Sequence, residues 1–141
     1  MPVPGDQLDI PDEEVLYRRL SDDSPNMVTI DKATGLRRPS SGAFKPDEDG
    51  ISVFRDSVLR KRELSAEVLA DRSLGQLIAS IRVGQVRQGD MGVRDDPWPP
   101  GVPDPSHPKW EAHALIVGFE QLSKNDRIRK QRLLASQATL H

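Results

Sequence analysis

The stretch RRPSSGAF, Arg37–Phe44, combines residue types that can hold an anion. Ser40-Ser41-Gly42 offers successive backbone amides and two hydroxyls in a turn, and such a concave row of donors binds negative groups. Arg37 and Arg38 can add charge-assisted hydrogen bonds to phosphate or carboxylate, and Lys45 adds a third cation. We therefore predict a ligand-binding turn made by Arg37, Arg38, Ser40, Ser41 and Gly42.

A second interpretation of this stretch is a solvated turn. In that case the serines bond local backbone groups. The arginines would then pair with the acidic residues that follow, at Asp47, Glu48 and Asp49. The spacing is not that of a phosphate-binding Walker loop, because no Gly-x-x-x-x-Gly-Lys occurs.

His113 is the second candidate for chemistry. It stands at the start of the most apolar stretch, AHALIVGF (112–119), and a histidine at the end of a strand is well placed to act as a general acid or base. The alternative is a histidine that bonds a backbone carbonyl at the sheet edge. His107 lies six residues before it and His141 ends the chain, so neither gives the spacing of a metal site. We predict no metal and assign no cofactor.

Two glutamates flank the same apolar stretch. Glu111 and Glu120 would lie about 30 Å apart along a straight strand, so they cannot form a carboxylate pair. The order of Arg18 or Arg19, then Ser40-Ser41, then a late glutamate is similar to that in ADP-ribosyltransferase-like domains. This resemblance would imply NAD as a substrate. The spacing here is not diagnostic and the usual motif around the late glutamate is absent, so no family is assigned.

A proline-rich loop, 95–109, carries six of the twelve prolines. Proline has no amide donor and a fixed φ, so the loop cannot be helix or central strand. Trp98 and Trp110 bracket it and are candidates for binding a protein partner. Alternatively, both tryptophans fold back and pin the loop to the domain.

The remaining elements follow from periodicity and turn residues. Residues 1–14 are expected to form an extended N-terminal arm, and residues 15–141 a single domain. Val15–Leu20 could be a strand or a helical turn. Leu74, Leu77, Ile78 and Ile81 have helical spacing, which predicts a helix to about Ile81 and an extended segment from there to Arg87. The other expected elements are strands at 27–30, 51–54 and 112–119, helices at 65–72 and 123–140, a helical turn at 57–62 and a hairpin arm at 93–96.

These elements do not alternate as strand–helix–strand units. The sequence therefore predicts an α+β fold, with a small, mostly antiparallel sheet, a helical central section and a C-terminal helix packed on it. Ser123 is the expected N-cap of that last helix, with Asp126 three residues later.

Composition narrows the function classes. The chain of 141 residues has a net charge of −2 and no cysteine. The small net charge argues against a whole-protein electrostatic field that would bind nucleic acid. The absence of cysteine excludes disulfides and a thiol nucleophile. No long apolar run indicates a membrane span. The acidic N-terminus does not look like a signal peptide, so we expect a cytoplasmic protein; its oligomeric state stays open.

The leading hypothesis is a small accessory domain that binds a protein partner, or an anionic small ligand at Arg37–Phe44. The alternative is a small enzyme that acts on a nucleotide or other phosphorylated substrate, NAD included. Its arginines would clamp the anion, and His113 or a flanking glutamate would transfer a proton. A third hypothesis, nucleic-acid contact through the basic helix at 123–140, is less favoured because the whole chain is not basic.

Overall fold

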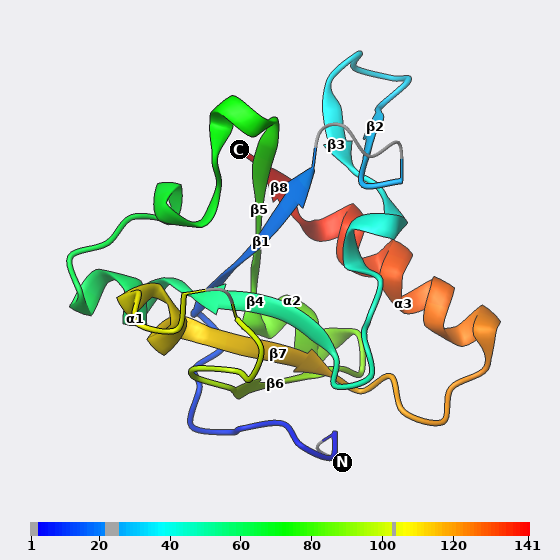
Figure 1. Cartoon of the computed structure of the whole chain (residues 1–141). Coiled ribbons are helices and arrows are strands. Elements are labelled where there is room, and N and C mark those ends of the chain that lie inside the picture. The colour runs from blue at the N-terminus through cyan, green and yellow to red at the C-terminus, as the bar shows by residue number, and fades with distance from the viewer. Residues whose placement is uncertain (1–2, 22–25, 103) are drawn as a thin grey trace.

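One antiparallel sheet forms the centre of the protein (Figure 1). The computed structural model describes residues 3–21, 26–102 and 104–141, and within them six strands lie in the order β6-β7-β4-β1-β5-β8. Neighbouring strands pair antiparallel. The predicted α+β class, with its mostly antiparallel sheet and C-terminal helix, is confirmed. The strands are β1 (Val15–Ser21), β4 (Ile51–Arg55), β5 (Gln76–Arg82), β6 (Gly92–Asp95), β7 (His113–Val117) and β8 (Thr139–Leu140).

The other elements surround this sheet. A separate hairpin is formed by β2 (Val28–Ile30) and β3 (Arg37–Pro39). The helices are α1 (Asp56–Lys61), α2 (Val83–Gln88) and α3 (Lys124–Gln137). Four short 3₁₀ helices complete the described part: η1 (Ser41–Phe44), η2 (Ala66–Leu69), η3 (Arg72–Leu74) and η4 (Pro108–Ala112).

The sheet splits between β1 and β4. β1 pairs with β5 from Val15 to Ser21, but its register with β4 covers only Leu16–Arg55 and Tyr17–Phe54. Beyond Tyr17 the two strands diverge. In Figure 1, β6, β7 and β4 run across the lower half of the molecule, and β1 and β5 rise away from them. The fork between the two halves is where a side chain or a ligand can enter the sheet.

Apolar clusters cover both faces of the sheet. The larger cluster joins strand residues such as Leu16 and Val53 to Phe44 of η1 and Leu134 of α3. The smaller one, on the opposite face, is built from Phe54, Leu59, Leu69 and Ala112, with Tyr17 and Trp110 against it. Burial on both faces explains why β7 reads as a continuous apolar run, and the predicted strand at 112–119 is confirmed over His113–Val117.

The prediction for residues 74–87 was wrong in both halves. Residues 76–82 form strand β5 and residues 83–88 form helix α2. Ile78 and Ala79 are successive residues that point to opposite faces of β5, and both are buried. A strand covered on both faces produces apolar spacings that mimic a helix. The start of α2 is set by tertiary contacts, because Val83 and Gly84 donate their amides to the carbonyls of Glu14 and Asp12.

The N-terminal segment is held against the sheet. Arg87 of α2 pairs with Asp6 at 3.0 Å and with Asp12 at 2.7 Å, and it also donates to the backbone carbonyls of Gln7 and Ile10. The Ile10 side chain is buried in the larger cluster. The described part of the arm, residues 3–14, therefore belongs to the packed structure.

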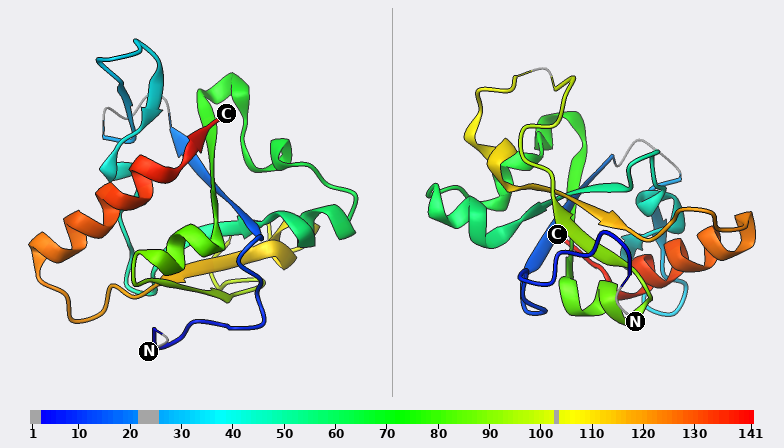
Figure 2. Two further views of the ribbon diagram at one scale, coloured as in Figure 1. Left: turned by 180° about the vertical axis from the view of Figure 1, so that it is seen from behind. Right: turned by 90° about the horizontal axis from the view of Figure 1, so that it is seen from below.

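The C-terminal helix and the proline-rich loop lie apart (Figure 2). α3 begins after Ser123, whose hydroxyl accepts the amide of Asp126 at 3.1 Å, so the predicted N-cap is confirmed. The helix expected at 65–72 is reduced to the 3₁₀ helices η2 and η3, and Ser65 makes no capping bond. The described parts of the loop between β6 and η4, residues 96–102 and 104–107, lie at the top of the right-hand view of Figure 2.

Candidate functional site

Ser52 and His113 meet on the face of the sheet that carries the smaller cluster. β4 and β7 pair with Ser52 opposite Leu115 and Phe54 opposite His113. Ser52 and His113 are therefore diagonal neighbours on one face, within reach of each other. The Oγ of Ser52 and the Nε2 of His113 are hydrogen-bonded.

Asp96 fixes the other side of the imidazole. β6 pairs with β7 up to Asp95–Ala114, which places Asp96 beside His113. The Nδ1 of His113 lies 2.8 Å from the backbone carbonyl of Asp96 and 3.4 Å from its carboxylate. These contacts assign the tautomer: Nδ1–H donates to Asp96, and the lone pair of Nε2 accepts the hydroxyl of Ser52.

His113 is held neutral by its surroundings. Only 4% of the residue is exposed, and the rings of Phe54 and Trp110 lie 5.3 Å and 5.7 Å from its own. Burial lowers the pKa of His113 below its ordinary value of 6.5, against the opposing effect of Asp96. A neutral imidazole whose Nε2 faces a hydroxyl has the lone pair needed to accept that hydroxyl's proton.

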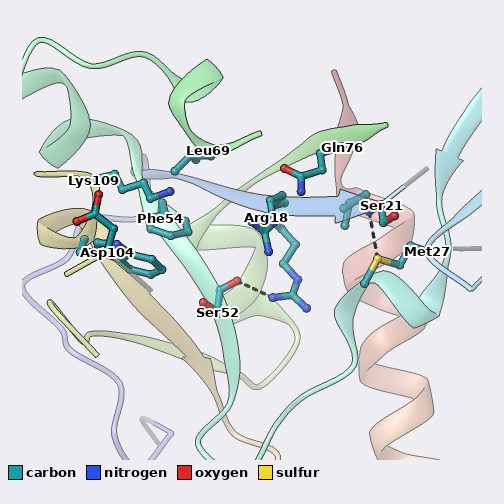
Figure 3. A pocket seen from close by; sticks show the side chains of 12 residues that line it. Arg18, Ser21, Met27, Ser52, Phe54, Leu69, Gln76, Asp104 and Lys109 are labelled. Carbon is teal, nitrogen blue, oxygen red and sulfur yellow. Dashed lines mark hydrogen bonds between the residues drawn. The ribbon is translucent and has the colours of Figure 1, made fainter. Parts of the chain in front are cut away.

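Arg18 fills the fork in the sheet. Its guanidinium donates to the backbone carbonyls of Ala43 at 3.0 Å and Ser52 at 2.9 Å, as Figure 3 shows for Ser52. Burial lowers the pKa of Arg18, and Asp47 partly opposes this. Within residues 3–21, 26–102 and 104–141, no carboxylate lies within 4.0 Å of the guanidinium. The positive charge of Arg18 is thus hydrogen-bonded to two neutral carbonyls. The other N–H groups of its guanidinium can donate to an anion.

Trp110 supplies an unused donor. Its indole Nε1 is buried and has no hydrogen-bond partner in the described part of the chain. A buried donor of this kind is rare in folded proteins and marks a place for a water or a ligand. Trp110 comes from η4, which packs its ring against Phe54 at 5.5 Å.

These side chains line two adjoining hollows. The larger is a cleft of about 450 Å³ in the fork, lined by Arg18, Arg19, Ser52, Phe54, Lys109 and Trp110 among others (Figure 3). The smaller, of about 240 Å³, contains Asp96 and His113. Ser52 and Trp110 line both hollows, so these two residues stand at their junction. The cleft volume is in the range of small-molecule sites.

The turn predicted from Arg37–Phe44 lies elsewhere. Arg38, Ser40, Ser41 and Gly42 do line one open cavity, of about 720 Å³, but neither Arg37 nor His113 is part of it. The structure therefore does not bring Arg38 together with His113. Ser40 gives its amide to the carbonyl of Met27 at 2.9 Å and its hydroxyl to that of Asn26, so its donors serve the local backbone.

The two tryptophans have different surroundings. Trp110 is packed between Phe54 and His113, whereas Trp98 is 50% exposed. The amide of Trp98 donates to the carbonyl of Trp110 at 3.1 Å, which ties the start of the loop to η4. Trp98 also has a φ of 47°, a strained value for a bulky residue.

Glu111 and Glu120, the late glutamates of the order that is similar to ADP-ribosyltransferase-like domains, do not line the cleft. Glu111 pairs with Arg62, and Glu120 lines hollows beside Asp49. Neither lines the cleft with Arg18, and Ser40-Ser41 is also outside it.

Sequence reasoning missed Ser52 and Asp96 as site residues, and it named Arg18 only as an alternative to Arg19 in the order that resembles ADP-ribosyltransferase-like domains. A polar residue inside an apolar strand is the signal that could have found Ser52, which interrupts the run Ile51–Phe54. Asp96 carries no such signal, because its role depends on how β6 pairs with β7. Arg18 resembles any charged residue of a strand until the fork is known.

Comparison of this chain with protein-family models, curated proteins and solved structures gave no match. In the described part of the chain, no group of three or more His, Cys, Asp or Glu side chains is placed to hold a metal ion, and no helix is long and apolar enough to cross a bilayer. A functional hypothesis therefore depends on the geometry of the site.

Proposed function

We propose that this protein is a small hydrolase that cleaves an ester bond in a negatively charged small molecule through a nucleophilic Ser52. The observation that carries this proposal is the chain of contacts from the Ser52 hydroxyl to His113 and from His113 to Asp96. A nucleophile bonded to a base that is itself oriented by a third group is the geometry of nucleophilic serine catalysis.

The reaction proceeds in two steps. His113 Nε2 takes the hydroxyl proton as Ser52 Oγ attacks the electrophilic centre of the ester, and the leaving oxygen departs with that proton. Water then attacks the covalent intermediate, gives a proton to Nε2, and the bond to Ser52 breaks as Oγ is reprotonated. The net reaction consumes one water and yields an acid and an alcohol.

The charge of the larger cleft, on the Arg18 side of Ser52, supports an anionic substrate, whereas the smaller hollow at His113 is lined by Asp47, Asp49 and Asp96. Arg18, Arg19 and Lys109 line the larger cleft, with Asp104 as the acidic residue among the lining side chains. Arg18 contacts the carbonyl of Ser52 itself, so its remaining donors lie close to the reacting residue. With the indole N–H of Trp110, they are the donors available to stabilise a developing negative charge.

The test is covalent labelling with a fluorophosphonate probe, which reacts with activated serines and needs no knowledge of the substrate. Peptide mapping should place the label on Ser52, and Ser52→Ala and His113→Gln should abolish it. Ser80→Ala is the matched control, because Ser80 Oγ also contacts a histidine, His141, at 2.7 Å in an exposed pair. Labelling of Ser80, or none at all at neutral pH, would overturn the proposal.

A turnover assay then addresses the substrate. p-Nitrophenyl acetate and p-nitrophenyl phosphate differ in charge and in the atom attacked. We expect the phosphorylated compound to be favoured in the native protein, and Lys109→Gln to reduce that preference. If the native protein and Lys109→Gln both turned over the two compounds at equal rates, the proposal of an anionic substrate would be refuted. The proposal that Ser52 is the nucleophile would stand.

A further inference from the structure

The open cavity beside the β2–β3 hairpin is lined by three cations and by neutral residues. It holds about 720 Å³ and is separate from the cleft at Ser52, since the two share none of their lining residues. Three cations reach it from different parts of the chain: Arg38 from β3, Lys45 from the segment after η1, and Arg132 from α3. Its lining is completed by Asn26, Thr29, Ser40, Ser41, Gly42 and Ala135.

Among the described residues, no acid pairs with these cations. None of the lining residues is acidic, and among the described residues no carboxylate lies within 4.0 Å of Arg38, Lys45 or Arg132. Exposed arginines elsewhere do have such partners: Arg62 pairs with Glu111, and Arg72 with Glu67. Three like charges around one hollow repel each other, and a multivalent anion would relieve that repulsion.

The backbone that carries these residues is anchored. Ala43 and Phe44 of η1 are fully buried, and Ala135 on α3 is 4% exposed. A Cβ on Gly42 would overlap the carbonyl oxygen of Asn26, so glycine is needed for the close approach of these two segments. A fixed backbone removes the backbone part of the entropy cost of ligand binding, so that mainly the side chains of the cavity have to be ordered.

We infer that this cavity binds a small ligand with at least two phosphate groups. The hollow of about 720 Å³ has room for more than one phosphate, and each further phosphate adds negative charge that the three cations can bind. The planar guanidinium groups of Arg38 and Arg132 suit bidentate contacts to phosphate oxygens. The hydroxyls of Ser41 and Thr29 and the side-chain amide of Asn26 line the same hollow as neutral donors.

Isothermal titration of the full chain with inorganic orthophosphate, pyrophosphate and triphosphate tests this inference. We expect affinity to rise from orthophosphate to triphosphate, and Arg132→Gln to weaken triphosphate binding by about tenfold or more. Arg127→Gln is the matched control, since Arg127 is an exposed arginine of the same helix that lines another hollow; it should change the affinity by less than about twofold.

Three results would overturn the inference. The first is that titration with triphosphate at low salt gives no heat of binding. The second is an equal loss in Arg127→Gln, which would indicate general charge attraction. The third is binding of a single-stranded oligonucleotide with no binding of triphosphate, which would assign the surface to nucleic acid. Ser52→Ala should bind triphosphate as the native protein does, so this result stands apart from the proposed hydrolase.

Discussion

The hydroxyl of Ser52 and the imidazole Nε2 of His113 are hydrogen-bonded across the β4–β7 pair, 61 positions apart in the chain. Ser80 and His141, also 61 positions apart, make a similar contact at the other end of the sheet. The first pair differs in being enclosed by aromatic rings and in having Asp96 on the far side of the imidazole. We therefore expect Ser52 to be more reactive than Ser80, because of the aromatic rings and Asp96 around His113 and not because of the serine–histidine contact itself.

Labelling of Ser52 should depend on one ionisation in the acid range. His113 is a base only when neutral, and burial lowers its pKa below 6.5. The labelling rate should therefore be flat at neutral pH and fall with a midpoint below 6.5, as a pH series of fluorophosphonate rates would show. A midpoint above 6.5 would contradict the assigned environment of His113.

The same pKa shift predicts how stability varies with pH. Because His113 has a lower pKa in the folded protein than the 6.5 of the unfolded chain, the unfolded chain binds more protons as the pH falls below 6.5. The free energy of unfolding should therefore fall as the pH drops below 6.5. Above pH 6.5 the contribution of His113 to stability is fully present. Urea titrations at a series of pH values should show that the free energy of unfolding falls less in His113→Gln than in the native protein. His141→Gln, at an exposed histidine, serves as control.

Replacement of Arg18 should destabilise the fold. Arg18→Met removes the donors to the carbonyls of Ala43 and Ser52 at the point where β1 and β4 separate. Loss of two such bonds should cost about 2–5 kcal/mol in the free energy of unfolding. Its neighbour Arg19 is exposed, so Arg19→Met should change that value by less than about 0.5 kcal/mol. Equal effects in urea titrations would show that Arg18 does not hold the fork together.

Arg55 is predicted to be the more sensitive of two paired arginines. It binds the buried carboxylate of Glu14 at 3.2 Å and that of Asp95 at 2.7 Å. Arg55→Ala would leave the buried charge of Glu14 without its cation, at a cost of about 3–5 kcal/mol. Arg60 makes an exposed i,i+4 pair with Asp56, so Arg60→Ala should cost about 0.5 kcal/mol or less. Thermal unfolding of both variants compares the two, and a small loss in Arg55→Ala would refute the prediction.

Arg87 should govern the order of the N-terminal segment. Arg87→Ala removes the contacts to Asp6, Asp12 and the carbonyls of Gln7 and Ile10. The segment should then open locally, and the amides of residues 7 and 10 should exchange at least about tenfold faster by hydrogen–deuterium exchange. Arg129→Ala, on the far helix, should leave that exchange unchanged. Unchanged exchange in Arg87→Ala would mean that burial of Ile10 and the hydrogen bonds of Asp6 and Gln7 with β6 are enough to hold the segment.

Local sequence was enough to predict several elements. The α+β class, the strand at His113–Val117 and the Ser123 cap follow from apolar runs and turn chemistry, which act within a few residues. Residues 74–87 show the limit of this reasoning, because burial of β5 on both faces gave its apolar residues a helix-like spacing. His113 was identified as a candidate by its place at the start of a strand.

Only the tertiary structure revealed what His113 faces. Its contact with Ser52 requires β4 beside β7 in one register, and a slip of one residue would turn Ser52 to the opposite face. Its contact with Asp96 requires β6 on the other side of β7, and Arg18 reaches Ser52 because β1 and β4 diverge. The residue types are written in the sequence, but non-local strand pairing brings them together, because side chains far apart in the chain meet only where the backbone hydrogen bonds of the sheet align them.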